Sequence, residues 1–146
     1  QSAYALYRQG LANYNQITGI DRDQTPVIEA ATLFASFLEL YPKGEQSGEV
    51  RDKVVLLRTM KARHEIYVGR FYLRTEKYTS AIGRLEGALH DFSGEADLDE
   101  ALFYLGQAYI LSGEQSKGRD TFHRLESDFP QSRFLKKAAK FLARHT

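Results

Sequence analysis

The sequence predicts an all-α protein, built as a solenoid of helical hairpins. Three observations predict this class. Apolar residues recur at spacings of three and four along most of the 146 residues, as they do on one face of an α-helix. No stretch alternates between apolar and polar residues with the period of two that strands show. Prolines, glycines and polar breaks divide the chain into segments, so we expect about seven helices.

The first two helices are predicted on either side of a polar break. The first begins at Ser2 and ends at about Ile17. Thr25 is expected to cap the second helix, because Pro26 suits the first helical position, where a missing N–H costs nothing. Pro42 is expected to end that helix. Its predicted apolar face consists of Ile28, Ala31, Phe34, Ala35, Leu38 and Tyr41.

An overlong helix is predicted near 48–75. This segment contains no proline, and Gly69 is its one interior glycine. At 1.5 Å per residue the helix would be roughly 40 Å long, which is long for a globular domain. A fourth helix follows over 78–92 and is broken by glycine at 94. The expected apolar lines are Val54, Leu57, Met60, Tyr67 and Phe71 on the long helix, and Tyr78, Ala81, Ile82, Leu85 and Leu89 on the fourth.

Three further helices complete the predicted chain. The fifth covers about 97–112 and is followed by Gly113, where a glycine commonly terminates a helix. The sixth covers about 115–129 and ends at Pro130. Ser132 is expected to cap the seventh. The apolar stripe predicted for this last helix is Phe134, Leu135, Ala138, Phe141 and Leu142.

An internal repeat relates the hairpins. The spacing of the tetratricopeptide repeat is followed by Leu102, Leu105, Gly106, Tyr109, Gly118, Phe122, Leu125 and Pro130. A shift of 37 residues places Gly69 and Leu85 in the positions of Gly106 and Phe122. Gly10 takes the same position in a third copy, which ends at Ala30, Phe34, Phe37 and Pro42. The polar break inserts eight extra residues into this copy. We therefore expect one tetratricopeptide-like solenoid over 1–146, with hairpins at 1–42, 48–93 and 97–130 and a capping helix at 132–145.

Several segments outside the general repeat pattern carry a family resemblance. They are residues 3–11 (AYALYRQGL), Asp21-Arg22-Asp23 in an unusually long loop, the stretch from Ala62 to Tyr72 in the overlong helix, and residues 78–87. A generic repeat protein would match only the small and aromatic positions. With these features the chain resembles, over essentially its whole length, the C-terminal half of the BamD family, repeat lipoproteins of the outer-membrane β-barrel assembly machine.

The resemblance implies a non-enzymatic periplasmic scaffold at the inner face of the outer membrane. Family members bind the periplasmic POTRA region of BamA, assemble with other lipoproteins of the machine and help to recruit unfolded outer-membrane proteins. Recruitment is ascribed mainly to N-terminal repeats, which this sequence does not contain. Membrane attachment is expected only through a lipid-bearing cysteine that is also absent here.

The motifs that would indicate an enzyme, a cofactor or a metal are incomplete. His64-Glu65 begins like a zinc-protease motif, but Val68 stands where the second histidine is required. Gly113 and Gly118 have the spacing of a phosphate-binding loop, but Arg119 replaces its lysine. We expect no catalytic residues, no cofactor and no metal. A net charge of +1 also argues against a nucleic-acid partner.

Two sets of residues are predicted to bind a protein partner. Arg63, Arg70 and Arg74 recur at i, i+7 and i+11, and so share one face of the long helix. The apolar stripe of the fourth helix leaves the opposite side outward, including Gly83, Arg84, Glu86 and Gly87, and the family resemblance implicates this stretch in holding the POTRA domain. The competing interpretation is an ordinary solvated arginine between glycines of no functional importance. The five Lys and Arg of 131–146 are interpreted as a solvated helix face.

Two other functions remain open. One is a different periplasmic repeat adaptor, similar to the cell-division coordinator CpoB, whose repeats also end in Tyr-Pro. Proteins of that type are expected to lack the overlong helix and the Asp21-Arg22-Asp23 insertion. The other is a generic peptide-binding repeat module, in which Arg70 and Arg74 would clamp a carboxylate.

Overall fold

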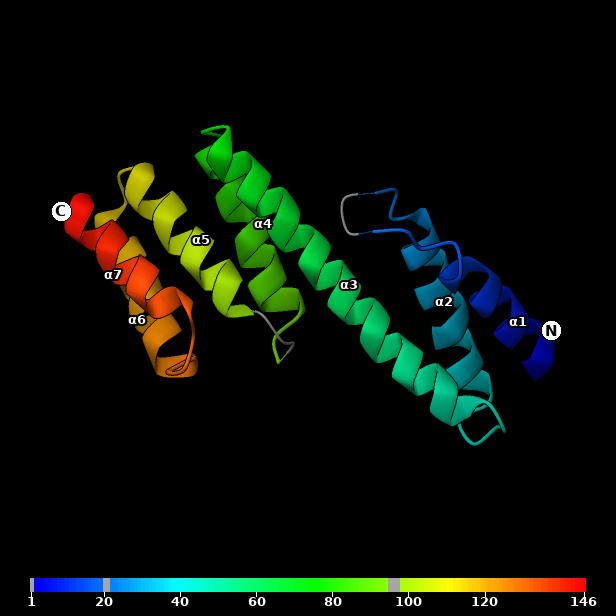
Figure 1. Cartoon of the computed structure of the whole chain (residues 1–146). Coiled ribbons are helices and arrows are strands. Elements are labelled where there is room, and N and C mark those ends of the chain that lie inside the picture. Colours follow the sequence, from blue (N-terminus) through cyan, green and yellow to red (C-terminus); the bar gives the residue numbers. More distant parts are fainter. Residues whose placement is uncertain (1, 20–21, 95–97) are drawn as a thin grey trace. The chain divides into compact units, whose positions relative to one another are not determined.

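The computed structural model describes residues 2–19, 22–94 and 98–146, and these form α-helices without any strand (Figure 1). The helices are α1 (Ala3–Tyr14), α2 (Thr25–Leu40), α3 (Ser47–Arg74), α4 (Tyr78–Asp91), α5 (Leu98–Leu111), α6 (Gln115–Asp128) and α7 (Phe134–Arg144). The all-α class is confirmed. The chain forms two compact units, residues 1–61 and 62–146, and α3 begins in the first and ends in the second. Asp21 of the quoted insertion lies outside the described residues.

The first unit packs α1 and α2 together with the first half of α3. Its buried core consists of Leu6, Val27, Ala30, Phe34, Phe37, Val50 and Leu57. A hydrogen bond of 2.6 Å from the Tyr7 hydroxyl to the Glu49 carboxylate joins α1 to α3. This bond raises the pKa of Tyr7, because losing the phenolic proton would remove the donor and place two negative charges side by side.

The start of α2 differs from the prediction. Thr25 is the first residue of the helix rather than its cap. The carboxylate of Asp23 takes the capping role, since it accepts from the Thr25 backbone N–H at 3.0 Å and from the Thr25 hydroxyl at 2.8 Å. Both bonds favour the ionised carboxylate and lower the pKa of Asp23. A second boundary also moves, because α1 ends at Tyr14 instead of about Ile17.

Two predicted helix faces were only partly correct, because Phe34 of α2 and Leu57 of α3 are buried but other predicted members are exposed. Ile28 is 54% exposed, and the buried stripe of α2 is Val27, Ala30, Phe34 and Phe37. On α3, Tyr67 and Phe71 are 43% and 54% exposed, while Ala62 and Ile66 are buried in their place. In both helices apolar residues occupy more than one face. Their spacing was therefore compatible with two alternative buried stripes, about 100° apart around the helix. The repeat alignment, which counts Ala30, Phe34 and Phe37 among the positions of the third copy, selected the correct face of α2.

The second unit is organised around α5, whose buried residues face α4, α6 and α7. The last helix packs on this unit, because Phe134 and Ala138 of α7 are buried and Phe134 stacks on Phe103 with ring centroids 5.2 Å apart. Ser132 caps α7 as expected, accepting from the Phe134 N–H at 3.1 Å. Its hydroxyl also donates to Asp99 at 2.6 Å, which ties the start of α7 to α5.

Glycine permits close helix packing at the same position of each repeat. A Cβ atom added at Gly10 would lie 2.3 Å from a side chain of the following helix. The corresponding distance is 2.6 Å at Gly69 and 2.4 Å at Gly106. The side chains concerned are Phe34, Leu85 and Phe122, respectively. Each contact is far shorter than carbon atoms tolerate, so only glycine fits without movement of the neighbour. Gly10 and Phe34 are eight residues farther apart in the sequence than the two other glycine and side-chain pairs, which matches the predicted insertion.

Two kinds of feature are missing from the part of the chain that the structure describes. No helix there is both long enough and apolar enough to cross a membrane. Within residues 2–19, 22–94 and 98–146 there is also no group of three or more His, Asp or Glu side chains placed to hold a metal ion.

Candidate partner-binding surface

The outward side of α4 carries two glycines that no internal contact requires. Burial of Ala81, Leu85, Ala88 and Leu89 fixes which side of the helix faces the core. A Cβ added at Gly83 or Gly87 would meet no atom within 4 Å. Gly83 is exposed and Gly87 is partly buried. Both glycines therefore weaken α4 by roughly 0.5–1 kcal/mol relative to alanine without a packing benefit inside the second unit.

Arg84 lies between these glycines and is held by an acidic residue of α3. Its Nη1 atom is 3.0 and 3.2 Å from the two carboxylate oxygens of Glu65. This ion pair raises the pKa of Arg84 above its ordinary value. The arginine side chain remains 46% exposed and that of Glu65 30% exposed. We call Glu65, Gly83, Arg84 and Gly87 the α4 surface.

Glu86 is exposed, as predicted, and lies at a groove beside the α4 surface. The Tyr109 hydroxyl of α5 donates a hydrogen bond to the Glu86 carboxylate. This groove encloses about 630 Å³ between α4, α5 and α6. Its lining residues include Glu86, Leu89, His90, Leu105, Tyr109, Thr121 and Arg124. The Glu86 carboxylate thus stabilises the packing of α4 against α5.

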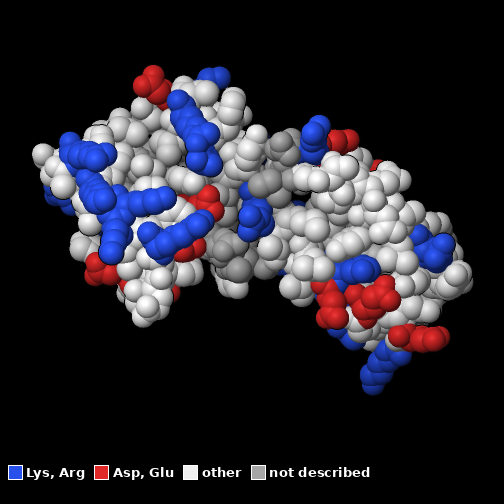
Figure 2. All heavy atoms as spheres, viewed as in Figure 1, with Lys and Arg blue, Asp and Glu red and all other residues white. Residues whose placement is uncertain are grey.

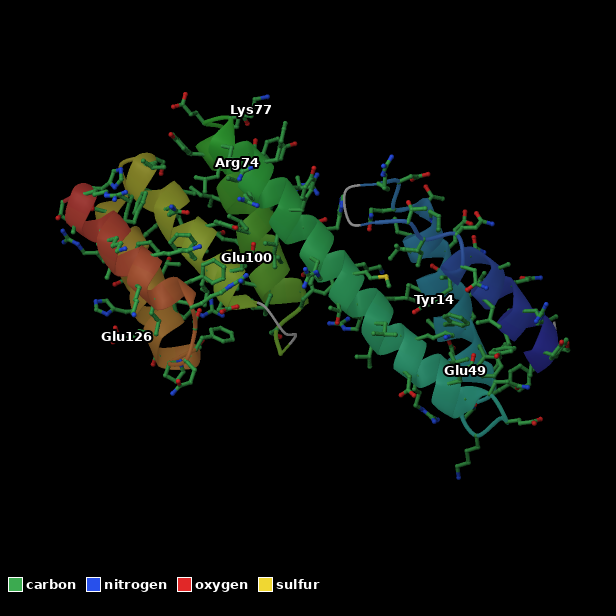
Figure 3. The ribbon with its side chains drawn as sticks, in the orientation of Figure 1. Tyr14, Glu49, Arg74, Lys77, Glu100 and Glu126 are labelled. Atoms are coloured by element: carbon green, nitrogen blue, oxygen red, sulfur yellow. The ribbon has the colours of Figure 1, made fainter. Side chains whose placement is uncertain are left out.

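The three arginines predicted on the long helix do share one face. Arg63, Arg70 and Arg74 are all exposed, and the exposed aromatic residues Tyr67 and Phe71 lie among them. We call these five residues the α3 row. Figure 3 shows Arg74 near the end of α3, close to the turn that carries Lys77. Aromatic residues and arginine are the types most enriched in the energetic centres of protein interfaces.

The middle of the α3 row contacts α5. The guanidinium carbon of Arg70 lies 5.7 Å from the centre of the Tyr104 ring. The Tyr104 hydroxyl donates to the Glu100 carboxylate at 2.8 Å. Burial, with a smaller contribution from this hydrogen bond, raises the pKa of Tyr104 to about 12. The phenol is therefore neutral at physiological pH, and its ring is a fixed support for Arg70.

The α4 surface and the α3 row are two separate surfaces. Glu65 follows Arg63 by two positions, which corresponds to about 200° around a helix. Arg84, bonded to Glu65, therefore lies on the opposite side of α3 from the arginines. Of the residues predicted to face outward, Gly87 is partly buried and the others are exposed. No sequence pattern indicated that Glu65 would pair with Arg84, because the two residues are 19 positions apart. The sequence pattern also assigned Tyr67 and Phe71 to the core. In the structure both are exposed beside the arginines and belong to the α3 row.

Comparison with known proteins assigns the chain to a family. Residues 1–121 match the family model YfiO, described as outer membrane lipoprotein. The chain is 27% identical over 139 residues to the outer membrane protein assembly factor BamD of Caulobacter vibrioides, covering 95% of this chain and 46% of that protein. It is 28% identical over 142 residues to BamD of Neisseria meningitidis serogroup A, covering 90% and 53%.

A third relative is BamD of Rickettsia prowazekii, which is 24% identical over 140 residues, covering 96% of this chain and 56% of that protein. The chain thus spans about half the length of the curated relatives it matches. The family match over residues 1–121 and the BamD relatives along nine-tenths or more of the chain agree with the resemblance seen in the sequence. The chain belongs to the YfiO family of outer membrane lipoproteins.

Proposed function

We propose that the chain is a non-enzymatic scaffold of outer-membrane protein assembly that docks on the periplasmic POTRA region of BamA. The names of its relatives, which are outer membrane protein assembly factors, support the general role. The description of the family as outer membrane lipoproteins supports a place at the periplasmic side of that membrane. Other lipoproteins of the machine and unfolded outer-membrane proteins are further partners under this proposal.

The observation that carries the proposal is the bare backbone on either side of Arg84. Gly69 and Gly106 are required by neighbouring side chains, but Gly83 and Gly87 face open space. Two glycines in one helix lower its stability, so a benefit outside the second unit is expected. A partner that approaches the α4 backbone closely provides that benefit. We assign this position to the POTRA region.

Arg84 is the polar centre of the proposed contact. One of its terminal nitrogens is committed to Glu65. A guanidinium has five N–H donors, so Nε and Nη2 keep donors for an acidic group of the partner. The ion pair orients the side chain before the partner binds, which reduces the entropy lost on binding. Glu65 therefore acts as a positioning residue for Arg84.

A titration against the POTRA region of the cognate BamA tests the contact. Arg84→Ala is expected to weaken binding by about 2–5 kcal/mol if the arginine is desolvated in the complex. The melting temperature should hardly change, because an exposed ion pair contributes only about 0–1 kcal/mol to stability. Glu65→Ala breaks the same ion pair but leaves the arginine in place, so it should weaken binding less than Arg84→Ala does. Equal affinities of wild type and Arg84→Ala would remove α4 from the interface.

Bulk on the α4 surface gives a second, independent test. Gly83→Gln and Gly87→Gln should stabilise the helix slightly, because glutamine is a better helix former than glycine. The same variants should weaken POTRA binding, because the new side chains occupy the space that the partner needs. Opposite changes in stability and affinity separate the proposed contact from a folding defect. Unchanged affinity in both variants would contradict close approach of a partner.

We propose the α3 row as a contact for a different acidic partner, such as another lipoprotein of the machine. Its exposed Tyr67 and Phe71 supply apolar area beside the three arginines. Tyr67→Ala and Phe71→Ala should leave POTRA binding unchanged, because the α4 surface lies on the opposite side of α3. Capture of purified lipoproteins of the machine by the wild type, but not by these variants, would support the assignment.

A further inference from the structure

Five cations form one straight row along α7. The spacing of Arg133, Lys136, Lys137, Lys140 and Arg144 places all of them within an arc of about 100° around the helix, over a length of about 16 Å. All five are exposed. Figure 2 shows Lys and Arg side chains gathered over the part of the second unit where α7 lies in Figure 1. We call these five residues the α7 row.

The α7 row has no internal counter-charge in the described parts of the chain. None of its five side chains forms an ion pair there, whereas Arg84, Lys117 and Arg124 are each paired with a carboxylate. Arg133 and Lys137 instead lie over the ring of Phe134, at 4.9 and 5.3 Å from its centre. Residues 131–146 contain no acidic residue. Mutual repulsion along the row is therefore uncompensated, which favours binding of an external anion.

The row is presented on a fixed helix. The opposite face of α7 packs on the second unit through Phe134 and Ala138, with Leu135, Phe141 and Leu142 partly buried. Its start is tied to α5 through Ser132. Its end is tied to α6, because the Gln115 side-chain amide donates to the His145 carbonyl at 3.0 Å. The apolar residues are thus occupied internally, and α7 can offer only charge to a partner.

The composition of the row favours a lipid surface over a protein. Lysine is depleted in protein interfaces, and such interfaces are centred on apolar or aromatic anchors. No large apolar side chain of α7 is strongly exposed, in contrast to Tyr67 and Phe71 on the α3 row. A straight line of flexible cations instead fits a planar, mobile array of phosphate groups. We propose that the α7 row docks on the anionic phospholipid headgroups of a bilayer, as a peripheral contact without insertion.

This inference is independent of the proposed docking on BamA, because it depends on α7 alone. Each Lys or Arg near an anionic membrane surface strengthens binding by about fivefold, which corresponds to about 1 kcal/mol. Five such contacts acting together give a reversible attachment. Salt should weaken it, since the interaction is screened over a Debye length of about 10 Å at 0.1 M ionic strength.

Sedimentation with vesicles tests the proposal. The purified chain is mixed with vesicles of phosphatidylcholine alone or with added phosphatidylglycerol. Wild type should bind the anionic vesicles, release them at high salt and ignore the neutral ones. The triple variant Lys136→Gln, Lys140→Gln and Arg144→Gln should bind about a hundredfold more weakly, given about fivefold per cation. Inorganic phosphate should compete no better than chloride at equal ionic strength if a headgroup array is required.

A matched control removes the same net charge elsewhere. Arg8→Gln, Lys43→Gln and Lys77→Gln alter three exposed cations on other elements and should leave vesicle binding within about twofold of the wild type. Circular dichroism spectra of both triple variants, which should match that of the wild type, check that the helices are kept. Three results would overturn the proposal. They are equal vesicle binding by the wild type and both triple variants, an equal loss of binding in both triple variants, and a wild type that does not prefer anionic vesicles. Binding of an acidic protein fragment without any vesicle preference would also overturn it and assign the row to a protein.

Discussion

Glu76 and Gly113 occupy the same position after two equivalent helices, 37 residues apart, and both have a left-handed backbone. The φ angle is +62° at Glu76, after α3, and +93° at Gly113, after α5. In each case the next residue donates its N–H 2.8 Å back to a carbonyl of the last turn, from Lys77 to Tyr72 and from Glu114 to Tyr109. This is the Schellman pattern of helix termination. The repeat thus conserves the turn geometry, although only one copy uses glycine.

The strain at Glu76 predicts a stabilising substitution. A side chain in the left-handed region costs roughly 1–2 kcal/mol, which glycine avoids. Glu76→Gly should therefore raise the free energy of unfolding by about 1 kcal/mol, measured by urea denaturation. Lys77→Gly is the control, because the φ angle of Lys77 is −96° and glycine brings no relief there. A loss of stability in Glu76→Gly would show that the side chain makes a contact worth more than the strain.

The two classes of glycine predict opposite effects of one substitution. Gly106→Ala would place a methyl group 2.4 Å from the Phe122 ring and should destabilise the chain by about 1–3 kcal/mol. Gly83→Ala enters open space and should stabilise the chain by about 0.5–1 kcal/mol. Thermal melts of both variants against the wild type measure the difference. If both variants changed the melting temperature in the same direction, the distinction between packed and open glycines would be refuted. The proposed α4 surface depends on that distinction.

Helix positions could be predicted from the sequence because local residues determine them. Pro42 and Pro130 cannot continue a helix, Gly113 suits a left-handed turn, and Ser132 offers a capping oxygen, so these boundaries were placed within one or two residues. The cap of α2 was misplaced by two residues. Asp23 and Thr25 can both accept a backbone N–H, and only the three-dimensional backbone decides between them.

Helix orientation and the candidate surfaces were less accessible to prediction. Tyr67 and Phe71 are apolar and correctly spaced for a core, yet Ala62 and Ile66 are buried instead. Small residues let helices approach closely, so the core of a repeat protein often follows them rather than its largest side chains. The pairing of Arg84 with Glu65 joins residues of two helices, and no local pattern encodes it.

The raised pKa of Tyr104 predicts a loss of stability at alkaline pH. Its folded pKa of about 12 exceeds the ordinary value of 10.0, so the fold favours the neutral phenol. Its contribution to stability is complete below about pH 10 and is lost as pH rises toward 12. Wild type should therefore lose stability relative to Tyr104→Phe across this interval, as measured by urea denaturation at each pH. All other residues are the same in the two proteins, so their contributions cancel in the comparison. Parallel profiles would contradict the burial of a neutral Tyr104.

The continuity of α3 predicts that proline is poorly tolerated at Lys61. This residue lies inside the helix, at the point where the first compact unit ends. Proline there would remove a backbone hydrogen bond and clash with the preceding turn, which costs about 3 kcal/mol in a helix interior. Lys61→Pro should lower the melting temperature and the helical signal, whereas Lys61→Ala, which keeps the backbone N–H, should leave both nearly unchanged. If Lys61→Pro melts like the wild type, residues 47–74 do not form a single helix in solution.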